Sequence, residues 1–171
     1  PLHGPILTEN LGYYINLYDI WSSYSVESEG VMIAYTSVYG NTKKAVNLLA
    51  DKLKEMGCPK VVVCDLARED MAEVIEDAFR YDRMIVCGAS YDGGVFPCMQ
   101  DFLHHLQSKA YQNRKVAIVE NGSWAPTAGK AMKAILETMK NVEIVEDMVT
   151  IKSTMKEADK PALEALVDQM V

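Results

Sequence analysis

The chain has 171 residues, enough for one domain with a complete hydrophobic core. Apolar residues make up 49% and charged residues 24%, the balance of an ordinary globular protein rather than a disordered chain. The formal net charge of −7 argues against a nucleic-acid partner, because such a partner requires a basic face. No apolar run approaches the ~18–20 residues of a membrane span, and no secretory signal is visible, so we expect a cytoplasmic protein without a membrane partner.

The four cysteines show neither a Cys-x-x-Cys pair nor a zinc-like spacing. Cys64 and Cys87 lie inside apolar runs, so we expect them to be buried small hydrophobic residues. This use of cysteine agrees with a reducing cytoplasm.

The first 30 residues differ in pattern from the rest of the chain. The sequence opens Pro1-Leu2-His3 without a methionine, so we expect it to begin partway through a longer protein. The apolar positions from Leu11 to Trp21 predict a short helix, and the polar run 22–30 predicts a linker. We therefore place a domain boundary near Gly30, between segments 1–29 and 30–171.

From residue 31 onward, strand-like runs alternate with helical patterns. Short continuous apolar runs, typical of strands covered on both faces, lie at residues 31–35, 61–64, 84–87 and 116–119. A fifth strand is expected within 142–151, although Glu146-Asp147 leaves its register open. Helices with one apolar face follow the strands, the last running to Met170. Five strands alternating with helices predict an α/β fold in which helices cover both faces of a parallel sheet.

In such a sheet, ligands bind beyond the carboxyl ends of the strands. The loop Thr36–Thr42 follows the first strand and precedes the first helix of the alternation, with donors at Ser37, Asn41 and Thr42. Converging amides and the helix dipole can hold a phosphate without Lys or Arg. The same residues are equally compatible with an ordinary helix cap.

Two other glycine motifs can be excluded. No Gly-x-Gly-x-x-Gly follows a strand, so the dinucleotide fingerprint is missing. The glycines around Gly129-Lys130 have the wrong spacing for a triphosphate loop, and Ala131 replaces the Ser or Thr that would bind magnesium.

The loops after the third and fourth strands each combine glycine with an aromatic residue. Residues 88–94 contain Tyr91 beside Asp92-Gly93, and residues 120–126 contain Trp124 close to Gly122. Glycine lets a backbone approach a ligand closely, and an aromatic side chain can stack on a flat ring. A phosphate at one loop and a flat ring between the other two describe a mononucleotide, and a flavin fits best.

Residues 31–171 resemble a flavodoxin domain, with Ser37-x-x-Gly40-Asn41-Thr42 after the first strand. Three loop sequences are similar to those of the flavodoxin domain of A-type flavoproteins, the flavodiiron proteins. They are Tyr39-Gly40-Asn41-Thr42, Tyr91-Asp92-Gly93-Gly94-Val95-Phe96-Pro97 and Asn121-Gly122-Ser123-Trp124-Ala125-Pro126. The resemblance implies a flavodoxin-like three-layer sandwich, α/β, with a five-stranded parallel sheet of order 2-1-3-4-5. It implies non-covalent FMN held by Ser37, Val38, Tyr39, Gly40, Asn41, Thr42, Ser90, Tyr91, Asp92, Gly93, Asn121, Gly122, Ser123 and Trp124.

One departure concerns the loop after the third strand. Many relatives have Ser/Thr-Pro-Thr there, whereas this chain reads Ala89-Ser90-Tyr91. The resemblance therefore leaves open how this loop would hydrogen-bond to a flavin.

In that family the FMN domain follows a metallo-β-lactamase-like domain with two irons that reduces O2 or NO. His3-Gly4-Pro5 resembles the place of that domain's last iron ligand, so residues 1–29 would be its C-terminal remnant and linker, with His3 an orphan ligand. The adjacent His104 and His105 point about 100° apart on a helix and do not chelate one metal well. We expect no metal in this chain and a diiron centre only in the intact parent protein.

The resemblance thus implies the redox domain of an oxidoreductase rather than a complete enzyme. Electrons would come from a rubredoxin-like donor and pass to the missing diiron domain, in a parent protein that is a homodimer. Electron transfer needs no acid–base or nucleophilic residues, and we identify no catalytic residue. The alternatives are a free-standing flavodoxin-like electron carrier, an FMN-dependent quinone reductase, and a cofactor-free receiver-type module. The last requires an acidic cluster at the first strand, where this chain has Thr36-Ser37.

Overall fold

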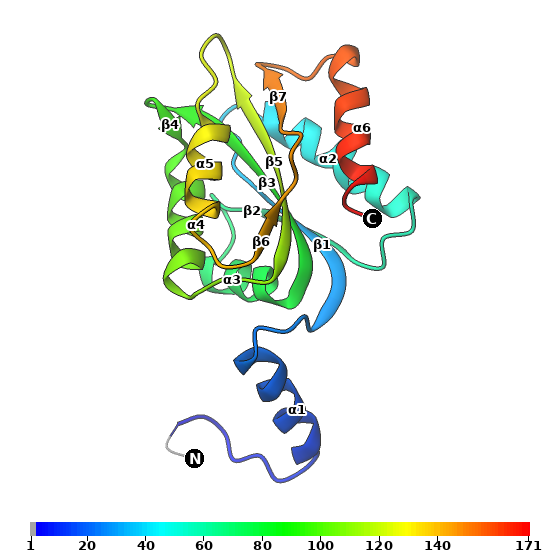
Figure 1. Cartoon of the computed structure of the whole chain (residues 1–171), viewed down its shortest axis with the longest axis vertical. Coiled ribbons are helices and arrows are strands. Elements are labelled where there is room, and N and C mark those ends of the chain that lie inside the picture. The colour runs from blue at the N-terminus through cyan, green and yellow to red at the C-terminus, as the bar shows by residue number, and fades with distance from the viewer. Residues whose placement is uncertain (1–2) are drawn as a thin grey trace.

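A parallel sheet forms the centre of the structure, a computed structural model that describes residues 3–171 (Figure 1). Its strand order is β2-β1-β3-β5-β6. The strands are β1 (Ser28–Tyr35), β2 (Val61–Asp65), β3 (Tyr81–Tyr91), β5 (Arg114–Gly122) and β6 (Val142–Ile144). With β5 as the expected fourth strand and β6 as the fifth, the predicted order 2-1-3-4-5 is confirmed. Each strand pairs in parallel with its neighbour along this path.

The fifth strand of the sheet is divided into two short pieces. β6 pairs with the start of β5, and β7 (Val149–Lys152) pairs with its end, both in parallel. Between them Glu146 and Asp147 are exposed, while Val145 still donates its N–H to the carbonyl oxygen of Val116. Because the hydrogen-bond ladder to β5 is interrupted at Glu146 and Asp147, both carboxylates remain exposed to solvent. The single strand expected within 142–151 is therefore two strands.

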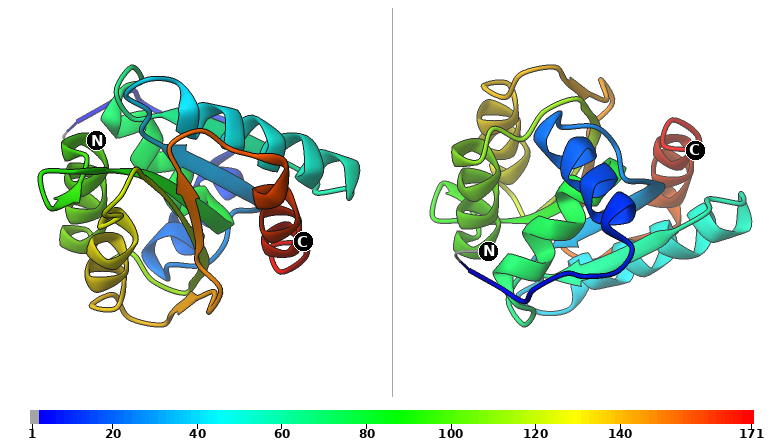
Figure 2. Two further views of the ribbon diagram at one scale, coloured as in Figure 1. Left: turned by 90° about the horizontal axis from the view of Figure 1, so that it is seen from above. Right: turned by 90° about the horizontal axis from the view of Figure 1, so that it is seen from below.

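Helices cover both faces of the sheet because its strands are apolar on both sides (Figure 2). In β1, Met32 and Ala34 pack in the core beneath three helices, α3 (Met71–Arg80), α4 (Pro97–Ser108) and α5 (Ala128–Leu136). The alternate residues Val31, Ile33 and Tyr35 pack beneath α2 (Asn41–Glu55) and α6 (Lys160–Asp168), the latter preceded by the 3-10 turn η1 (Glu157–Asp159). Cys64 and Cys87 are buried in these two cores, as predicted.

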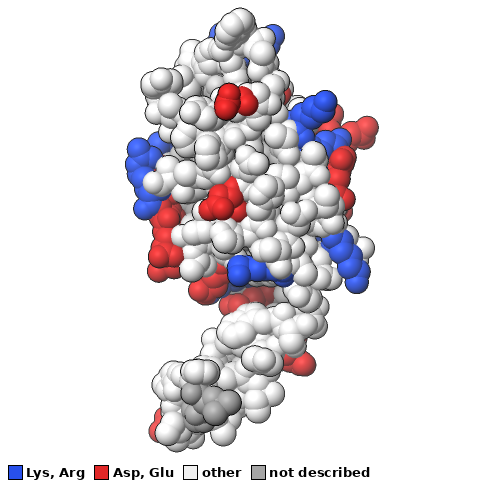
Figure 3. Space-filling model, turned by 90° about the vertical axis from the view of Figure 1, so that its left-hand side faces the viewer, with Lys and Arg blue, Asp and Glu red and all other residues white. Residues whose placement is uncertain are grey.

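The N-terminal segment projects from the domain as an arm (Figure 1). Its helix α1 (Leu11–Ser22) contains no buried residue. Large apolar side chains along the arm are exposed, among them Leu11, Tyr13, Ile15, Tyr18 and Trp21. Residues 3–22 include two acidic residues and neither Lys nor Arg, and Figure 3 shows a mainly uncharged arm below a body with charged flanks. Within the described part of the chain, no helix combines the length and the apolar character needed to cross a bilayer.

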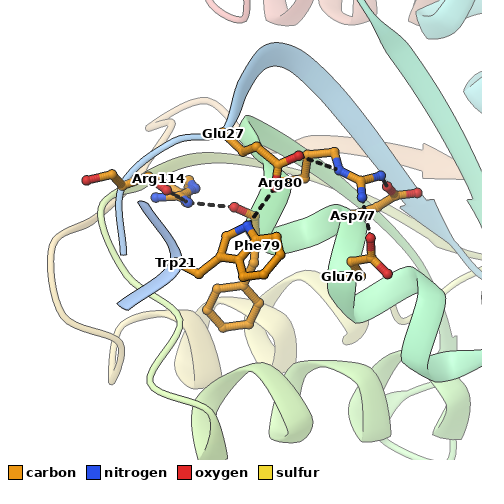
Figure 4. A network of polar contacts seen from close by, with 8 residues as sticks. Trp21, Glu27, Glu76, Asp77, Phe79, Arg80 and Arg114 are labelled. Carbon is orange, nitrogen blue, oxygen red and sulfur yellow. Dashed lines mark hydrogen bonds and ion pairs between the residues drawn. The ribbon is translucent and has the colours of Figure 1, made fainter. Parts of the chain in front are cut away.

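The segment between α1 and β1, predicted as a linker, is bound to the amino end of the sheet (Figure 4). The buried guanidinium of Arg114, in β5, donates to the carbonyl oxygens of Tyr24 and Ser25 at 2.9 and 3.0 Å. Glu27 accepts from the indole N–H of Trp21 at 2.7 Å and lies 3.3 Å from Nε of Arg80. These contacts fix the path of the chain from α1 into the sheet.

Candidate functional site

A cavity of about 310 Å³ opens at the carboxyl edge of the sheet, among the loops that follow β1, β3, β5 and β7. It is lined by Ser37, Val38, Tyr39, Asn41, Thr42, Ala89, Ser90, Asn121, Gly122, Ser123 and Ser153. Nine of these residues are among the fourteen predicted from the sequence. None of the described residues that line the cavity carries a charge. The walls therefore offer hydroxyl, amide and backbone groups to a ligand.

The amino end of α2 presents free amides to this cavity. Gly40 occupies the N-cap position with φ +83° and has no side chain to cap the helix, while Ser37 Oγ accepts from the N–H of Lys43 at 3.4 Å. Among the described residues, no acceptor is recorded for the N–H groups of Asn41 and Thr42, and the first turn contains no acidic residue. Unused amides at the positive end of a helix dipole favour an anion. Ser37 therefore caps one amide of the first turn, while the amides of Asn41 and Thr42 remain for an anion.

The amino end of α5 lies beside the same cavity, but its first amides are already engaged. Ser90 Oγ accepts from the N–H groups of Thr127 and Ala128 at 2.8 and 3.1 Å. The buried carboxylate of Glu120 accepts from the N–H of Gly129 at 2.8 Å. The first two amides of α5 are therefore engaged within the protein, whereas among the described residues no acceptor is recorded for the first two of α2.

The loop after β3 is a tight β-hairpin. Ser90 and Tyr91 pair with Val95 and Gly94 of β4 (Gly94–Val95), so Asp92-Gly93 forms a two-residue turn. Both turn residues have positive φ, 47° and 72°, as a type I′ turn requires. Tyr91 packs edge-on against Phe96 with ring centroids 5.4 Å apart. Tyr91, Asp92 and Gly93 lie outside the cavity lining, next to Ser90, which belongs to it.

The loops after β5 and β7 are tied to each other. Asn121 Nδ2 donates to the carbonyl oxygen of Ser153 at 2.7 Å, and the N–H of Ser153 donates back to Gly122 at 3.0 Å. Ser153 has φ +65° and lines the cavity, although the sequence pattern did not single it out. Its position after the fifth strand is the one sequence signal that could have found it. Trp124, 93% exposed, lies outside the lining.

Two residues behind the cavity hold the ends of the strands in place. The fully buried Thr36 accepts from the N–H of Ala89 at 3.4 Å, which links the ends of β1 and β3. Tyr35 donates its hydroxyl to Asp65 at 3.1 Å, which links β1 to β2. Burial, and then this hydrogen bond, raise the pKa of Tyr35 to about 12, so the phenol stays protonated as a donor.

No metal centre is formed by residues 3–171: they contain no group of three or more His, Cys, Asp or Glu side chains placed to hold an ion. His104 is exposed on α4, and His105 faces Asp101 at 3.7 Å. His3 is exposed in the arm.

The fold and this edge of the sheet define a mononucleotide-binding protein of the flavodoxin type. A family model described as the flavodoxin domain matches residues 32–160, and the chain belongs to this family. Membership implies that FMN is the cofactor. The free amides of α2 and the uncharged lining fit its phosphate, and the neighbouring aromatic loops fit its ring.

The chain is also similar to longer redox proteins. The structure of rubredoxin oxygen:oxidoreductase from Desulfovibrio gigas superposes with a TM-score of 0.86 at 18% identity, over 94% of this chain and 39% of that one. The anaerobic nitric oxide reductase flavorubredoxin of Escherichia coli is 21% identical over 72% of this chain and 26% of its own length. A flavodoxin of Streptococcus pneumoniae superposes with a TM-score of 0.69 at 22% identity, over 84% of this chain and 97% of that one. The chain thus spans well under half the length of the two reductases.

Proposed function

We propose that the chain is the FMN-binding electron-transfer domain of a flavodiiron-type O2 or NO reductase. It passes electrons from a rubredoxin-like donor to a diiron site that lies outside this chain. The observation that carries the FMN part of this proposal is the contrast between two helices at one cavity. Among the described residues, no acceptor is recorded for the first two amides of α2, while the first two amides of α5 donate to Ser90 and Glu120.

The residues of this chain have separate roles in the proposal. The backbone amides of Asn41 and Thr42, together with the side chains of Ser37, Asn41 and Thr42, hold the phosphate. Tyr91 and Trp124, both exposed in loops beside the cavity, flank the ring. FMN supplies the one- and two-electron chemistry, and the protein binds and orients it. Asp92, exposed at the hairpin tip, disfavours negative charge on the reduced ring and lowers its potential.

The N-terminal arm supports a longer parent protein. Residues 1–29 are proposed as the remnant of a metallo-β-lactamase-like domain plus linker, with His3 its orphan iron ligand, and residues 30–171 as the FMN domain. Exposed apolar side chains along α1 are what a helix shows when the surface that covers it is missing. The superposition on the D. gigas reductase extends over 94% of the chain, whereas that on the flavodoxin stops at 84%.

A second function, a free-standing flavodoxin-like carrier or an FMN-dependent quinone reductase, is favoured by one observation. The superposition on the pneumococcal flavodoxin spans 97% of that protein. Sequencing the coding region immediately upstream separates the two. An in-frame lactamase-like domain there supports the reductase, and an initiation codon directly before residue 1 supports the carrier.

The test of the FMN proposal is the absorption spectrum of the purified protein, followed by titration of the colourless fraction with FMN and with riboflavin. We expect flavin absorption bands and tighter binding of FMN than of riboflavin, because only FMN carries the phosphate. A protein that stays colourless and shows no affinity for FMN contradicts the proposal.

A further inference from the structure

The hydroxyl of Ser90 has an unusual set of partners. It accepts from two backbone amides of the α5 amino end, Thr127 N–H at 2.8 Å and Ala128 N–H at 3.1 Å. Among the described residues, no acceptor is recorded for its own hydrogen. Ser90 also lines the cavity, so this unused donor belongs to a side chain at the site itself.

These partners determine the direction of any further hydrogen bond. A serine hydroxyl has two acceptor lone pairs and one hydrogen to donate. Both lone pairs are engaged by amides, which can only donate. Ser90 can therefore offer a ligand its hydrogen but cannot accept a hydrogen from it. Most serines at a binding site can reverse direction by rotating the O–H bond, whereas this one is fixed as a donor.

The loop after β5 packs closely against Ser90. A Cβ placed on Gly122 would lie 3.0 Å from Ser90 Oγ and 2.8 Å from the Cα of Pro126. Because Gly122 has no side chain, the two loops can lie this close together while both still border the cavity.

This inference rests on the proposed function, which places the phosphate at α2 and the ring between Tyr91 and Trp124, next to Ser90. An electron carrier must bind its flavin in both the oxidised and the two-electron-reduced form. Ring nitrogen N5 is an acceptor when oxidised but carries a hydrogen when reduced, so a fixed donor would then oppose it. The ring carbonyl oxygens remain acceptors in both forms, and their negative charge increases on reduction. We propose that Ser90 donates a hydrogen bond to a carbonyl oxygen of the flavin ring and stabilises the reduced form more than the oxidised form.

The experiment compares dissociation constants for oxidised FMN and for dithionite-reduced FMN under anaerobic conditions. Ser90→Ala removes the donor, and Ser90→Thr retains a hydroxyl. Thr127→Val is the matched control, because it removes the 2.8 Å bond from Thr127 Oγ1 to the Gly94 carbonyl, another brace between α5 and the hairpin. The control leaves the amide of Thr127 and the hydrogen of Ser90 unchanged.

We expect Ser90→Ala to weaken the binding of oxidised FMN about three- to tenfold, which is the cost of one neutral hydrogen bond. The binding of reduced FMN should be weakened by a clearly larger factor. The ratio of the two constants should be unchanged in Thr127→Val and near wild type in Ser90→Thr. If Ser90→Ala weakens both forms equally, or the oxidised form more, Ser90 merely caps α5 and the inference is overturned.

Failure of the proposed function itself has a different signature. Wild-type protein would then bind neither form of FMN, before any variant is made. If Ser90→Ala does not fold, Ser90→Cys serves in its place, because a thiol is a much weaker donor at the same position. The same shift in the ratio is expected, and an unchanged ratio would overturn the inference.

Discussion

The guanidinium of Arg114 donates to the carbonyl oxygen of Ser25 at 3.0 Å, across 89 residues of sequence. The same side chain also donates to carbonyl oxygens of Tyr24, Phe79, Tyr81, Gln112 and Asn113. Burial lowers the pKa of Arg114, but a guanidinium stays charged at any ordinary pH. One buried cation thus joins the segment before β1 to the amino ends of β3 and β5.

Arg114→Met should therefore destabilise the domain by about 3 kcal/mol, because several buried carbonyl oxygens lose their donor together. Urea unfolding measures the loss, and limited proteolysis should show faster cleavage within residues 22–28. Lys115→Met, on the same strand, removes only a partly exposed pair with Glu143 and should cost about 0.5 kcal/mol or less. Equal losses for the two variants would show that the Arg114 contacts do not hold the segment.

The double substitution Asn41→Ala with Thr42→Ala should weaken FMN about tenfold or more and riboflavin much less. The side chains of both residues lie at the amino end of α2, where a phosphate is proposed, and riboflavin has no phosphate. Fluorescence titration with the two flavins measures both constants. An equal loss of affinity for both ligands would mean that this loop does not bind the phosphate.

Gly122→Ala should weaken the binding of the flavin ring and leave the preference for FMN over riboflavin unchanged. The new Cβ would lie 2.8 Å from the Cα of Pro126, a backbone atom that can move only with its loop. We expect FMN and riboflavin to lose affinity by the same factor, roughly tenfold, and the free energy of unfolding to fall by about 2 kcal/mol. Gly57→Ala is the control, since Gly57 lies outside the cavity lining, no atom lies within 4 Å of its Cβ, and its cost is the strain of φ +84°, about 1 kcal/mol. Wild-type flavin affinity in Gly122→Ala would contradict the proposed ring position.

Trp124 should report flavin binding by its fluorescence. The chain has two tryptophans, and Trp21 lies at the opposite, amino end of the sheet. In Trp21→Phe, FMN should quench most of the remaining emission, because an aromatic ring stacked on or beside a flavin loses its fluorescence. In Trp124→Phe, the emission of Trp21 should fall far less. Similar quenching in both variants would place Trp124 away from the ring.

The folded domain should lose stability at alkaline pH partly through Tyr35. Its pKa is raised to about 12 by burial and by the bond to Asp65, from 10.0 in the unfolded chain. A raised pKa means that the folded state keeps its proton longer, so this contribution is complete below pH 10 and is lost between pH 10 and 12.

Between about pH 9 and pH 11, wild type should therefore lose about 1 kcal/mol more of its free energy of unfolding than Tyr35→Phe does. Cys64, whose pKa burial also raises to about 12, is present in both proteins and cancels in the comparison. Tyr39→Phe, at a 90% exposed position, should behave as wild type. Identical losses in wild type and Tyr35→Phe would contradict the assignment.

Local pattern was sufficient to predict the alternation of strands and helices and the position of the first loop. Continuous apolar runs such as Val31–Tyr35 can be buried on both faces only in a helix-covered sheet, and nine of the fourteen predicted site residues line one cavity. The pattern underestimated the lengths of the strands. Polar residues at the strand ends, such as Ser28 and Arg114, pair in the sheet although they do not belong to an apolar run.

By itself, then, the sequence determined the class of fold and the edge of the sheet at which a cavity opens, because both depend on local periodicity and on groups close together in the chain. Only the tertiary structure decided which of the two helices has its first amides engaged by distant residues. Ser90 reaches Thr127 across 37 residues, and Ser153 joins Asn121 across 32, and no local pattern records contacts of that length. Hydrogen bonds formed at such distances depend on the packing of the whole sheet, and they turn a serine in a loop into a donor of fixed direction.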